Sequence, residues 1–190
     1  AKAGHTGGEF LAGIPGTIGG AAVMHAGAFG GEIWPMVVAV DTIDRRGTLH
    51  HRAAAEYSAS YRHLAGPVHE WFVAGELRFD ADPDRGAAMR IRALLARRNE
   101  TQPLGLPSCG STFKNPPGDH AGRLIEAAGM KGVRRGGAYV SPKHANFIIN
   151  DGTATAADIE GLMEDVRARV FATAGIMLEH EVRIVGEAVT

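Results

Sequence analysis

The chain has 190 residues, of which 45% are hydrophobic and 22% are charged. This balance is typical of one or two soluble, folded domains and excludes disordered, collagen-like and disulfide-framework chains. Because 20 Lys and Arg face 21 Asp and Glu, no strong overall charge points to nucleic acid or a membrane as the partner.

Further features of the sequence indicate a cytoplasmic protein. Apolar runs fall short of the roughly 20 residues that cross a bilayer, and the first residues lack the basic and apolar regions of a signal peptide. The single cysteine, Cys109, cannot form an internal disulfide, and we expect it to be a small buried side chain. Since the His residues show neither HxH nor HxxxH spacing, no metal site is predicted.

The first half of the chain is predicted to be rich in β-structure. Residues 13–32 are glycine-rich with small apolar residues between the glycines, which predicts tight, partly buried turns. Residues 37–43 and 72–79 are rich in β-branched and aromatic side chains and are predicted strands. A helix is predicted at 86–99. Its apolar face would consist of Met89, Ile91, Leu94 and Leu95.

The second half is predicted to be a small α+β unit. Asp119 is placed to cap a short helix that ends at Gly129, and a strand is predicted at 145–150. Thr155 and Asp158 have capping-box spacing, so a longer helix should begin after Thr155. Helical spacing continues through Ile159, Leu162, Met163, Val166 and Val170 to Gly175, and a closing strand is predicted at 181–186.

Two segments combine residue types that bind ligands. Residues 13–20, GIPGTIGG, can bring several backbone N–H groups together, as a pyrophosphate site requires, although they match neither a P-loop nor a complete dinucleotide fingerprint. Tight turns around a packed core are the alternative. The loop at 107–116 places Ser111, Lys114 and Asn115 between prolines. Ser111 lacks the GxSxG context of a nucleophile, and a solvated turn is the alternative.

Five motifs in order resemble the UDP-N-acetylenolpyruvoylglucosamine reductases. They are GIPGTIGGAAVMHAGAFGGE at 13–32, YR at 61–62, GSTFKNP at 110–116, GGAYVSPKHANFIIN at 136–150 and EHEVRIVG at 179–186. The resemblance covers nearly the whole chain. Two departures are His25, where the family commonly has Asn, and His63-Leu64 after the Tyr-Arg pair, where a Ser is expected.

The resemblance implies an α+β flavoprotein oxidoreductase of peptidoglycan synthesis, and hence of cell-wall biogenesis, cell shape and division. Such enzymes bind FAD, accept hydride from NADPH and reduce UDP-N-acetylglucosamine enolpyruvate to UDP-N-acetylmuramate. Residues 1–85 would be the second lobe of a two-lobed FAD-binding domain, 86–106 a connecting helix and linker, and 107–190 the C-terminal substrate-binding domain. The family's first FAD-binding lobe has no counterpart here, so we expect weak or absent FAD binding and little activity from this chain.

The resemblance also assigns roles to single residues. Ser111 would protonate the carbanionic carbon of the substrate, while Arg62 and a protonated Glu181 would hold and polarise its carboxylate. The flavin would lie along Gly13, Ile14, Pro15, Gly16, Thr17, Gly19 and Gly20, and the substrate would contact Tyr61, Lys114 and Asn115. Alternatives are a non-catalytic module that binds nucleotide sugars and, less favoured, another flavin-linked oxidase.

Overall fold

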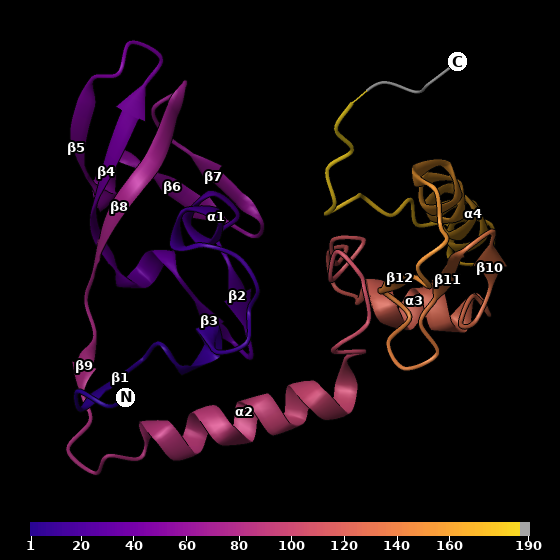
Figure 1. Cartoon of the computed structure of the whole chain (residues 1–190), viewed down its shortest axis with the longest axis horizontal. Coiled ribbons are helices and arrows are strands. Elements are labelled where there is room, and N and C mark those ends of the chain that lie inside the picture. Colours follow the sequence, from indigo (N-terminus) through magenta and orange to yellow (C-terminus); the bar gives the residue numbers. More distant parts are fainter. Residues whose placement is uncertain (187–190) are drawn as a thin grey trace. The chain divides into compact units, whose positions relative to one another are not determined.

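The computed structural model describes residues 1–186 and divides the chain into two compact units (Figure 1). The first unit is Ala1–Arg97 and the second is Arg98–Thr190. Strands predominate in the first unit, whereas two helices and a small sheet form the second. Each unit has its own buried hydrophobic cluster.

A three-stranded antiparallel sheet is the framework of the first unit, with β4 (Val37–Asp44) between β5 (Leu49–Ala53) and β8 (Glu70–Leu77). The strand predicted at 37–43 is confirmed. The strand predicted at 72–79 begins and ends two residues earlier, because its pairing with β4 starts where Glu70 faces Asp44 and stops where Leu77 faces Val37.

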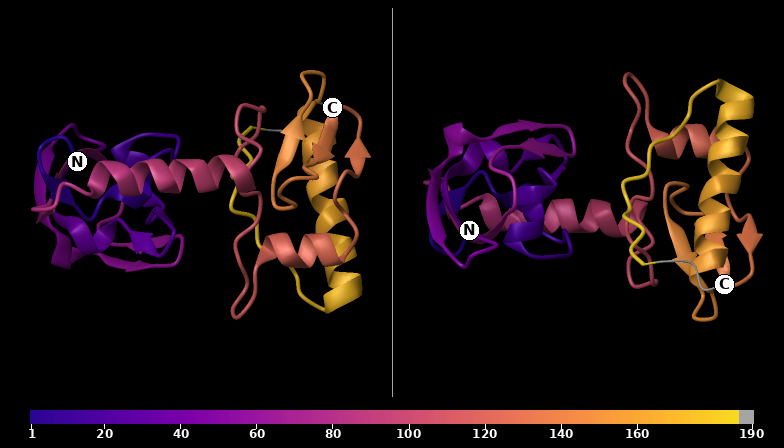
Figure 2. Two further views of the ribbon diagram at one scale, coloured as in Figure 1. Left: turned by 90° about the horizontal axis from the view of Figure 1, so that it is seen from below. Right: turned by 90° about the horizontal axis from the view of Figure 1, so that it is seen from above.

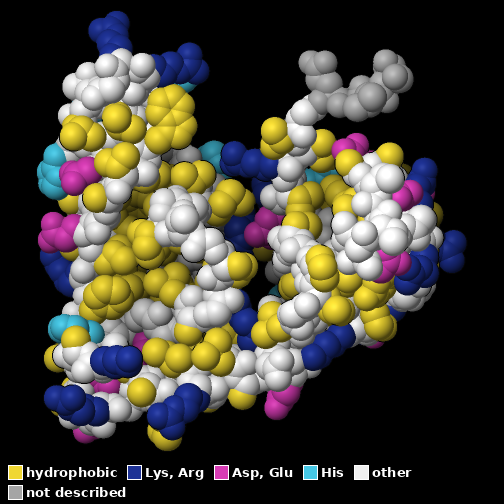
Figure 3. All heavy atoms as spheres, in the orientation of Figure 1, with side chains coloured by type: hydrophobic (Ala, Val, Ile, Leu, Met, Phe, Trp, Pro, Cys, Tyr) yellow, Lys and Arg dark blue, Asp and Glu magenta, His cyan; other side chains and the backbone are white. Residues whose placement is uncertain are grey.

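Short elements complete this unit. They are β1 (His5–Thr6) with β9 (Asp80–Ala81), β2 (Gly27–Ala28) with β3 (Gly31–Glu32), β6 (Ser58–Ser60) with β7 (His63–Ala65), the helix α1 (Ile18–Val23), and single 3-10 turns at Glu9–Leu11, Trp34–Met36 and Ala54–Glu56. Trp34 is central to the core: its Nε1 donates to the Ala22 carbonyl at 2.8 Å, and its ring centroid lies 4.8 Å from that of Tyr57. Hydrophobic side chains also reach the surface of both units (Figure 3).

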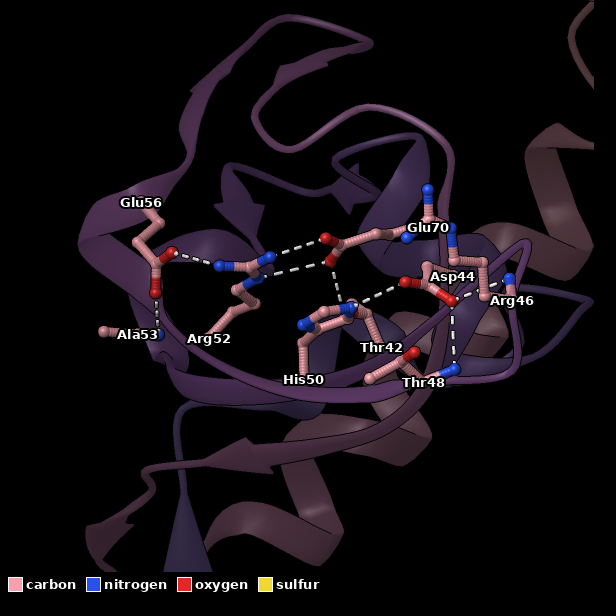
Figure 4. Close-up of polar contacts among 9 residues, drawn as sticks. All are labelled: Thr42, Asp44, Arg46, Thr48, His50, Arg52, Ala53, Glu56 and Glu70. Carbon is pink, nitrogen blue, oxygen red and sulfur yellow. Dashed lines mark hydrogen bonds and ion pairs between the residues drawn. The ribbon is translucent and has the colours of Figure 1, made fainter.

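A polar network crosses the sheet from β5 to β8 (Figure 4). Arg52 on β5 donates to the Glu70 carboxylate on β8 through Nη2 at 2.6 Å and Nε at 3.2 Å, and Thr42 on the strand between them donates to the same group. Arg52 also bonds Glu56 at 3.1 Å. The hydrogen bonds from Arg52 and then Thr42 lower the pKa of Glu70 below its ordinary value of 4.5, although desolvation opposes them.

Acid should weaken the first unit through Glu70. A carboxyl whose pKa is lower in the folded chain stabilises the fold above its unfolded value and loses that contribution as the pH falls through the folded value. We therefore expect Glu70→Gln to lower the Tm by several degrees near pH 7 and to reduce the further fall in acid. Tryptophan fluorescence can measure this, because Trp34 and Trp71 are the only tryptophans. Glu76→Gln, on an exposed position of the same strand, should change neither quantity; equal pH profiles for both variants would contradict the prediction.

The helix predicted at 86–99 is confirmed as α2 (Ala87–Thr101), but its expected apolar face is partly wrong. Met89 is 70% exposed and Leu95 is 38% exposed. At 3.6 residues per turn Met89 lies almost opposite Ala87, and the better-buried positions follow a different stripe. That stripe consists of Ala87, Ile91, Leu94 and Arg98.

The second unit places two helices beside a three-stranded antiparallel sheet in the order β10 (Arg134–Arg135), β11 (Ala138–Val140) and β12 (Ile148–Asn150). The longer helix, α4 (Ala156–Ala174), packs against all three strands and against α3 (Ala121–Ala127) (Figure 2). The fully buried side chains of this core include Phe113, Ile125, Val140, Leu162, Val166 and Val170.

The ends of α4 agree with the prediction. The Thr155 side chain accepts from the Asp158 N–H at 3.1 Å, and the Asp158 carboxylate accepts from the Thr155 N–H at 2.9 Å, which completes the capping box. Gly175 ends the helix in the left-handed conformation at φ 68°. None of the helices in residues 1–186 is both long enough and apolar enough to cross a membrane.

Two predictions in this unit are wrong. The residue before α3 is His120 rather than Asp119, and the Asn115 side chain accepts from the Ala121 N–H at 3.0 Å, so a residue six positions away caps the first turn. Asp119 instead binds the His120 N–H at 2.7 Å. No strand forms at 181–186: a single bridge between Phe113 and His180 precedes this segment, and its residues are exposed from Arg183 to Gly186. The strand predicted at 145–150 is reduced to β12.

Candidate functional site

Residues 111–115 lie between two segments of the second unit, and backbone hydrogen bonds join them to both. On one side, the Thr112 N–H donates to the Asn146 carbonyl at 2.8 Å. On the other, the Thr112 carbonyl accepts from the Glu181 N–H at 2.9 Å, and the Lys114 N–H donates to the Glu179 carbonyl at 2.9 Å. The fold therefore brings Ser111 and Glu181, which are 70 positions apart in the sequence, onto hydrogen-bonded neighbouring segments.

A cavity of about 380 Å³ lies beside this loop, and Ser111 is part of its wall. Its other polar lining side chains include Asn115, His120, Arg123, Lys143 and His144. These residues come from the loop, from α3 and from the turn before β12. The cavity is therefore lined by the second unit alone and combines a hydroxyl, two amides, two cations, two imidazoles and the carboxylate of Glu126.

The electrostatics of the cavity favour an anionic ligand. Lys143 and Arg123 contribute positive charge against the carboxylate of Glu126, and the Glu126 carboxylate is itself paired with Lys131 at 2.7 Å. Arg123 donates a hydrogen bond to the Asp119 carboxylate. This bond, together with one from the His120 N–H, lowers the pKa of Asp119 to about 2. Asp119 offsets the charge of Arg123, so Lys143, whose Nζ donates to the Asn99 carbonyl, supplies the remaining positive charge for a phosphate-bearing ligand.

His144 is the titratable residue in the cavity wall with the clearest environment. Burial lowers its pKa below the ordinary value, so the imidazole is neutral near pH 7. Its Nδ1 accepts from the Asn146 N–H at 3.3 Å. The neutral ring therefore fixes the turn before β12 and adds no charge to the cavity.

Two residues of the loop are placed differently from the cavity-lining groups. The Lys114 ammonium is paired with the Glu179 carboxylate, and Lys114 does not belong to the residues that line the cavity. Cys109, expected to be buried, is exposed, because the loop runs over the surface of the unit. Partial burial of its sulfur raises the pKa of the Cys109 thiol.

In the first unit, Arg62 is fixed by the glycine-rich segment. Its Nη1 donates to the His25 carbonyl at 3.3 Å and its Nη2 to the Gly27 carbonyl at 3.2 Å, while its Cζ lies 4.9 Å from the ring centre of Tyr61. Arg62 has φ 53°, in the left-handed region. Two segments singled out in the sequence, 13–32 and 61–62, are thus joined through one guanidinium.

His25, whose carbonyl accepts one of these hydrogen bonds from Arg62, is buried. Its Nε2 lies 3.2 Å from the Glu32 carboxylate. His25 also has a positive φ of 43°, a conformation that Asn adopts more readily than most residues. The residue at which this sequence departs from the family pattern therefore provides one of the two carbonyls that accept hydrogen bonds from Arg62.

The segment 13–20 is more exposed than its composition predicts. Gly13 and Gly16 have φ 77° and 120°, and a Cβ added at Gly16 would meet nothing within 4 Å. Thr17 caps α1 by accepting from the Gly20 N–H at 3.1 Å. An open, glycine-rich backbone beside the 53% exposed Ile18 fits an extended cofactor with a phosphate and a planar ring. Within residues 1–186 no group of three or more His, Cys, Asp or Glu could bind a metal ion.

The comparisons with known proteins agree with these features. The family model described as the C-terminal domain of UDP-N-acetylenolpyruvoylglucosamine reductase matches residues 102–185. The reductase of Alkalilimnicola ehrlichii is 59% identical over 189 residues, covering 98% of this chain and 63% of the relative. That of Methylococcus capsulatus is 60% identical over 182 residues, covering 96% and 60%.

A solved structure is also similar. The crystal structure of UDP-N-acetylenolpyruvylglucosamine reductase from Thermus caldophilus gives a TM-score of 0.86 at 35% identity, covering 96% of this chain and 65% of that one. The chain thus spans less than two thirds of the length of each of these proteins.

Proposed function

Because the chain belongs to the UDP-N-acetylenolpyruvoylglucosamine reductase family, we propose that it serves the FAD-dependent, NADPH-using reduction of UDP-N-acetylglucosamine enolpyruvate to UDP-N-acetylmuramate. The reaction belongs to peptidoglycan precursor synthesis in the cytoplasm. The strongest support is the basic cavity with Ser111 in its wall, inside the unit that matches the family's C-terminal domain.

The glycine-rich segment is the proposed FAD site. Residues 13–20 offer an exposed backbone without Cβ atoms at four positions, which allows close approach of the cofactor. When bound, FAD would pass to the substrate the hydride that NADPH supplies. The chain itself contributes this backbone and, further along the same glycine-rich segment, the His25 and Gly27 carbonyls that bind Arg62.

Arg62 and Glu181 are proposed to stabilise the charge that reduction creates. Addition of hydride to the enolpyruvyl double bond leaves negative charge on the α-carbon and the carboxylate, and a fixed guanidinium favours that charge. The carbonyls of His25 and Gly27 hold the Arg62 fork in one orientation. Glu181 would have to be protonated, since an ionised carboxylate would repel the substrate. In that form it can donate a hydrogen bond.

Ser111 is proposed to finish the reaction by giving its hydroxyl proton to the α-carbon. A serine hydroxyl is a weak acid, so it donates only to a strongly basic, carbanion-like carbon. Ser111 is half-buried in the cavity wall, within reach of a ligand bound there. Asn115 and Lys114 would face the nucleotide-sugar side, with Tyr61 contributing from the first unit.

A binding experiment tests the cavity. Calorimetric titration with UDP should show binding to the unsubstituted chain and about 10- to 100-fold weaker binding to Asn115→Asp, the loss expected when a charged ligand loses a hydrogen-bond donor and meets a negative oxygen. The substitution retains the oxygen that accepts from the Ala121 N–H, so α3 keeps its cap. Asn150→Asp, in the same unit, is the control. Equal affinities in all three proteins would contradict the assignment of the cavity.

The alternative, a non-catalytic module that binds nucleotide sugars, makes a different prediction. Such a module needs only the cavity of the second unit. It would bind UDP and remain colourless even with FAD in large excess, whereas the proposed reductase would acquire the visible absorbance of bound flavin at high FAD concentration. The titration and the spectrum together therefore separate the two functions.

A further inference from the structure

We infer that Asn146 is a positioning residue for Ser111, acting through the backbone of the two residues that follow the serine. This inference rests on the proposed role of Ser111 as proton donor. Asn146 lies 35 positions from Ser111 and is itself part of the wall of the cavity.

Asn146 makes three hydrogen bonds to Thr112 and Phe113. Its Oδ1 accepts from the Phe113 N–H at 3.0 Å, its Nδ2 donates to the Phe113 carbonyl at 2.8 Å, and its own carbonyl accepts from the Thr112 N–H at 2.8 Å. The residue is 4% exposed. Its side-chain amide thus pairs with Phe113 as a neighbouring strand would, with one donor and one acceptor.

These bonds fix the loop because both participants are anchored elsewhere. Asn146 leads into β12, and its N–H donates to His144. The Phe113 side chain is 1% exposed in the core of the unit. Ser111 is therefore one residue away from a backbone held by Asn146 on one side and by the Glu181 N–H on the other.

Placement of a proton donor controls its rate, because a displacement of about 1 Å of a reacting group can cost about 100-fold. The side chain of Asn146 binds both backbone polar groups of Phe113. Loss of the amide would free the carbonyl of Phe113 and let the Ser111 backbone shift, without removing any group that touches the substrate's reacting carbon.

Asn146→Asp tests the inference with almost unchanged side-chain volume. One oxygen still accepts from the Phe113 N–H, but the other replaces the donor and faces the Phe113 carbonyl, so two acceptors repel. In the flavin-loaded protein we expect reoxidation by UDP-N-acetylglucosamine enolpyruvate to slow by about 10- to 100-fold, with reduction by NADPH within about twofold. Lower pH should partly restore reoxidation, because a protonated carboxyl can donate again.

Asn150→Asp is the matched control. Asn150 lies on β12, and its Oδ1 accepts from Gly152 and Ala154 N–H groups at 2.8 and 3.2 Å, contacts that an aspartate retains. It should leave both half-reactions unchanged. Adding Asn146→Asp to Ser111→Ala should slow reoxidation no further, since residues that act through one group are not additive.

A measurement without flavin gives a second test. Hydrogen exchange of the Thr112 and Phe113 amides should be faster in Asn146→Asp, while the amides of residues 152–154 keep their wild-type rates. Wild-type exchange or wild-type reoxidation in Asn146→Asp would overturn the positioning role, as would equal slowing of both half-reactions. Unchanged reoxidation in Ser111→Ala would instead contradict the proposed function itself.

Discussion

Ser111→Ala is expected to slow reoxidation of the reduced flavin by UDP-N-acetylglucosamine enolpyruvate about 10²- to 10⁴-fold, the usual contribution of a positioned general acid. Reduction of the flavin by NADPH should stay within about twofold, because the hydroxyl takes no part in it. Stopped-flow absorbance of the flavin-loaded protein separates the two half-reactions.

The effect should be specific to one hydroxyl of the loop. Ser108→Ala is the matched control, since Ser108 is three residues earlier, exposed and bridged to Ile149. It should react like the unsubstituted protein. If Ser111→Ala slowed both half-reactions equally, the substitution would be acting on flavin binding or on the fold, and Ser111 would not be the proton donor.

Arg62→Lys is expected to reduce the rate of reoxidation about 10²- to 10³-fold, the cost of removing one preorganised donor from developing negative charge. Lysine keeps the charge but not the planar fork, and the fork is what binds the carbonyls of His25 and Gly27 together. A lysine ammonium is a single point charge. It cannot bind the two carbonyls and the substrate carboxylate at once with the geometry that the planar guanidinium provides.

The measurement is again the reoxidation rate, now as a function of substrate concentration, because a carboxylate clamp should affect both affinity and the rate at saturation. Arg45→Lys, at an exposed position in the same unit, controls for the general change of arginine to lysine. Near-normal reoxidation in Arg62→Lys would exclude Arg62 as the group that stabilises the substrate carboxylate.

Local patterns were enough to predict those parts of the fold that depend on near neighbours. The capping box of Thr155 and Asp158 and the left-handed Gly175 define α4 within the helix itself, and the β-branched run of β4 forms a central strand. The prediction of a strand at 181–186 was wrong because a strand depends on a distant part of the chain. The apolar pattern of this segment resembles a strand, but a strand needs a partner, and the one bridge to residues 111–115 is at His180, just before this segment.

The same limit applies to the candidate site. The sequence singled out Ser111, Arg62 and Asn115 through their motifs, yet the groups that position them are distant. The cap of α3 comes from Asn115 rather than from the adjacent Asp119, and the carbonyls that bind Arg62 precede it by 37 and 35 residues. Asn146 lay in a motif that supported the family resemblance, but only the folded chain shows which backbone groups its side chain binds.

The most direct test is to incubate the protein with FAD, reduce it with NADPH under anaerobic conditions, and add UDP-N-acetylglucosamine enolpyruvate. We predict that the visible flavin absorbance is lost with NADPH and returns with the substrate, and that UDP-N-acetylmuramate appears in equal amount. Reduced flavin that stays reduced after the substrate is added would contradict the proposed reductase function.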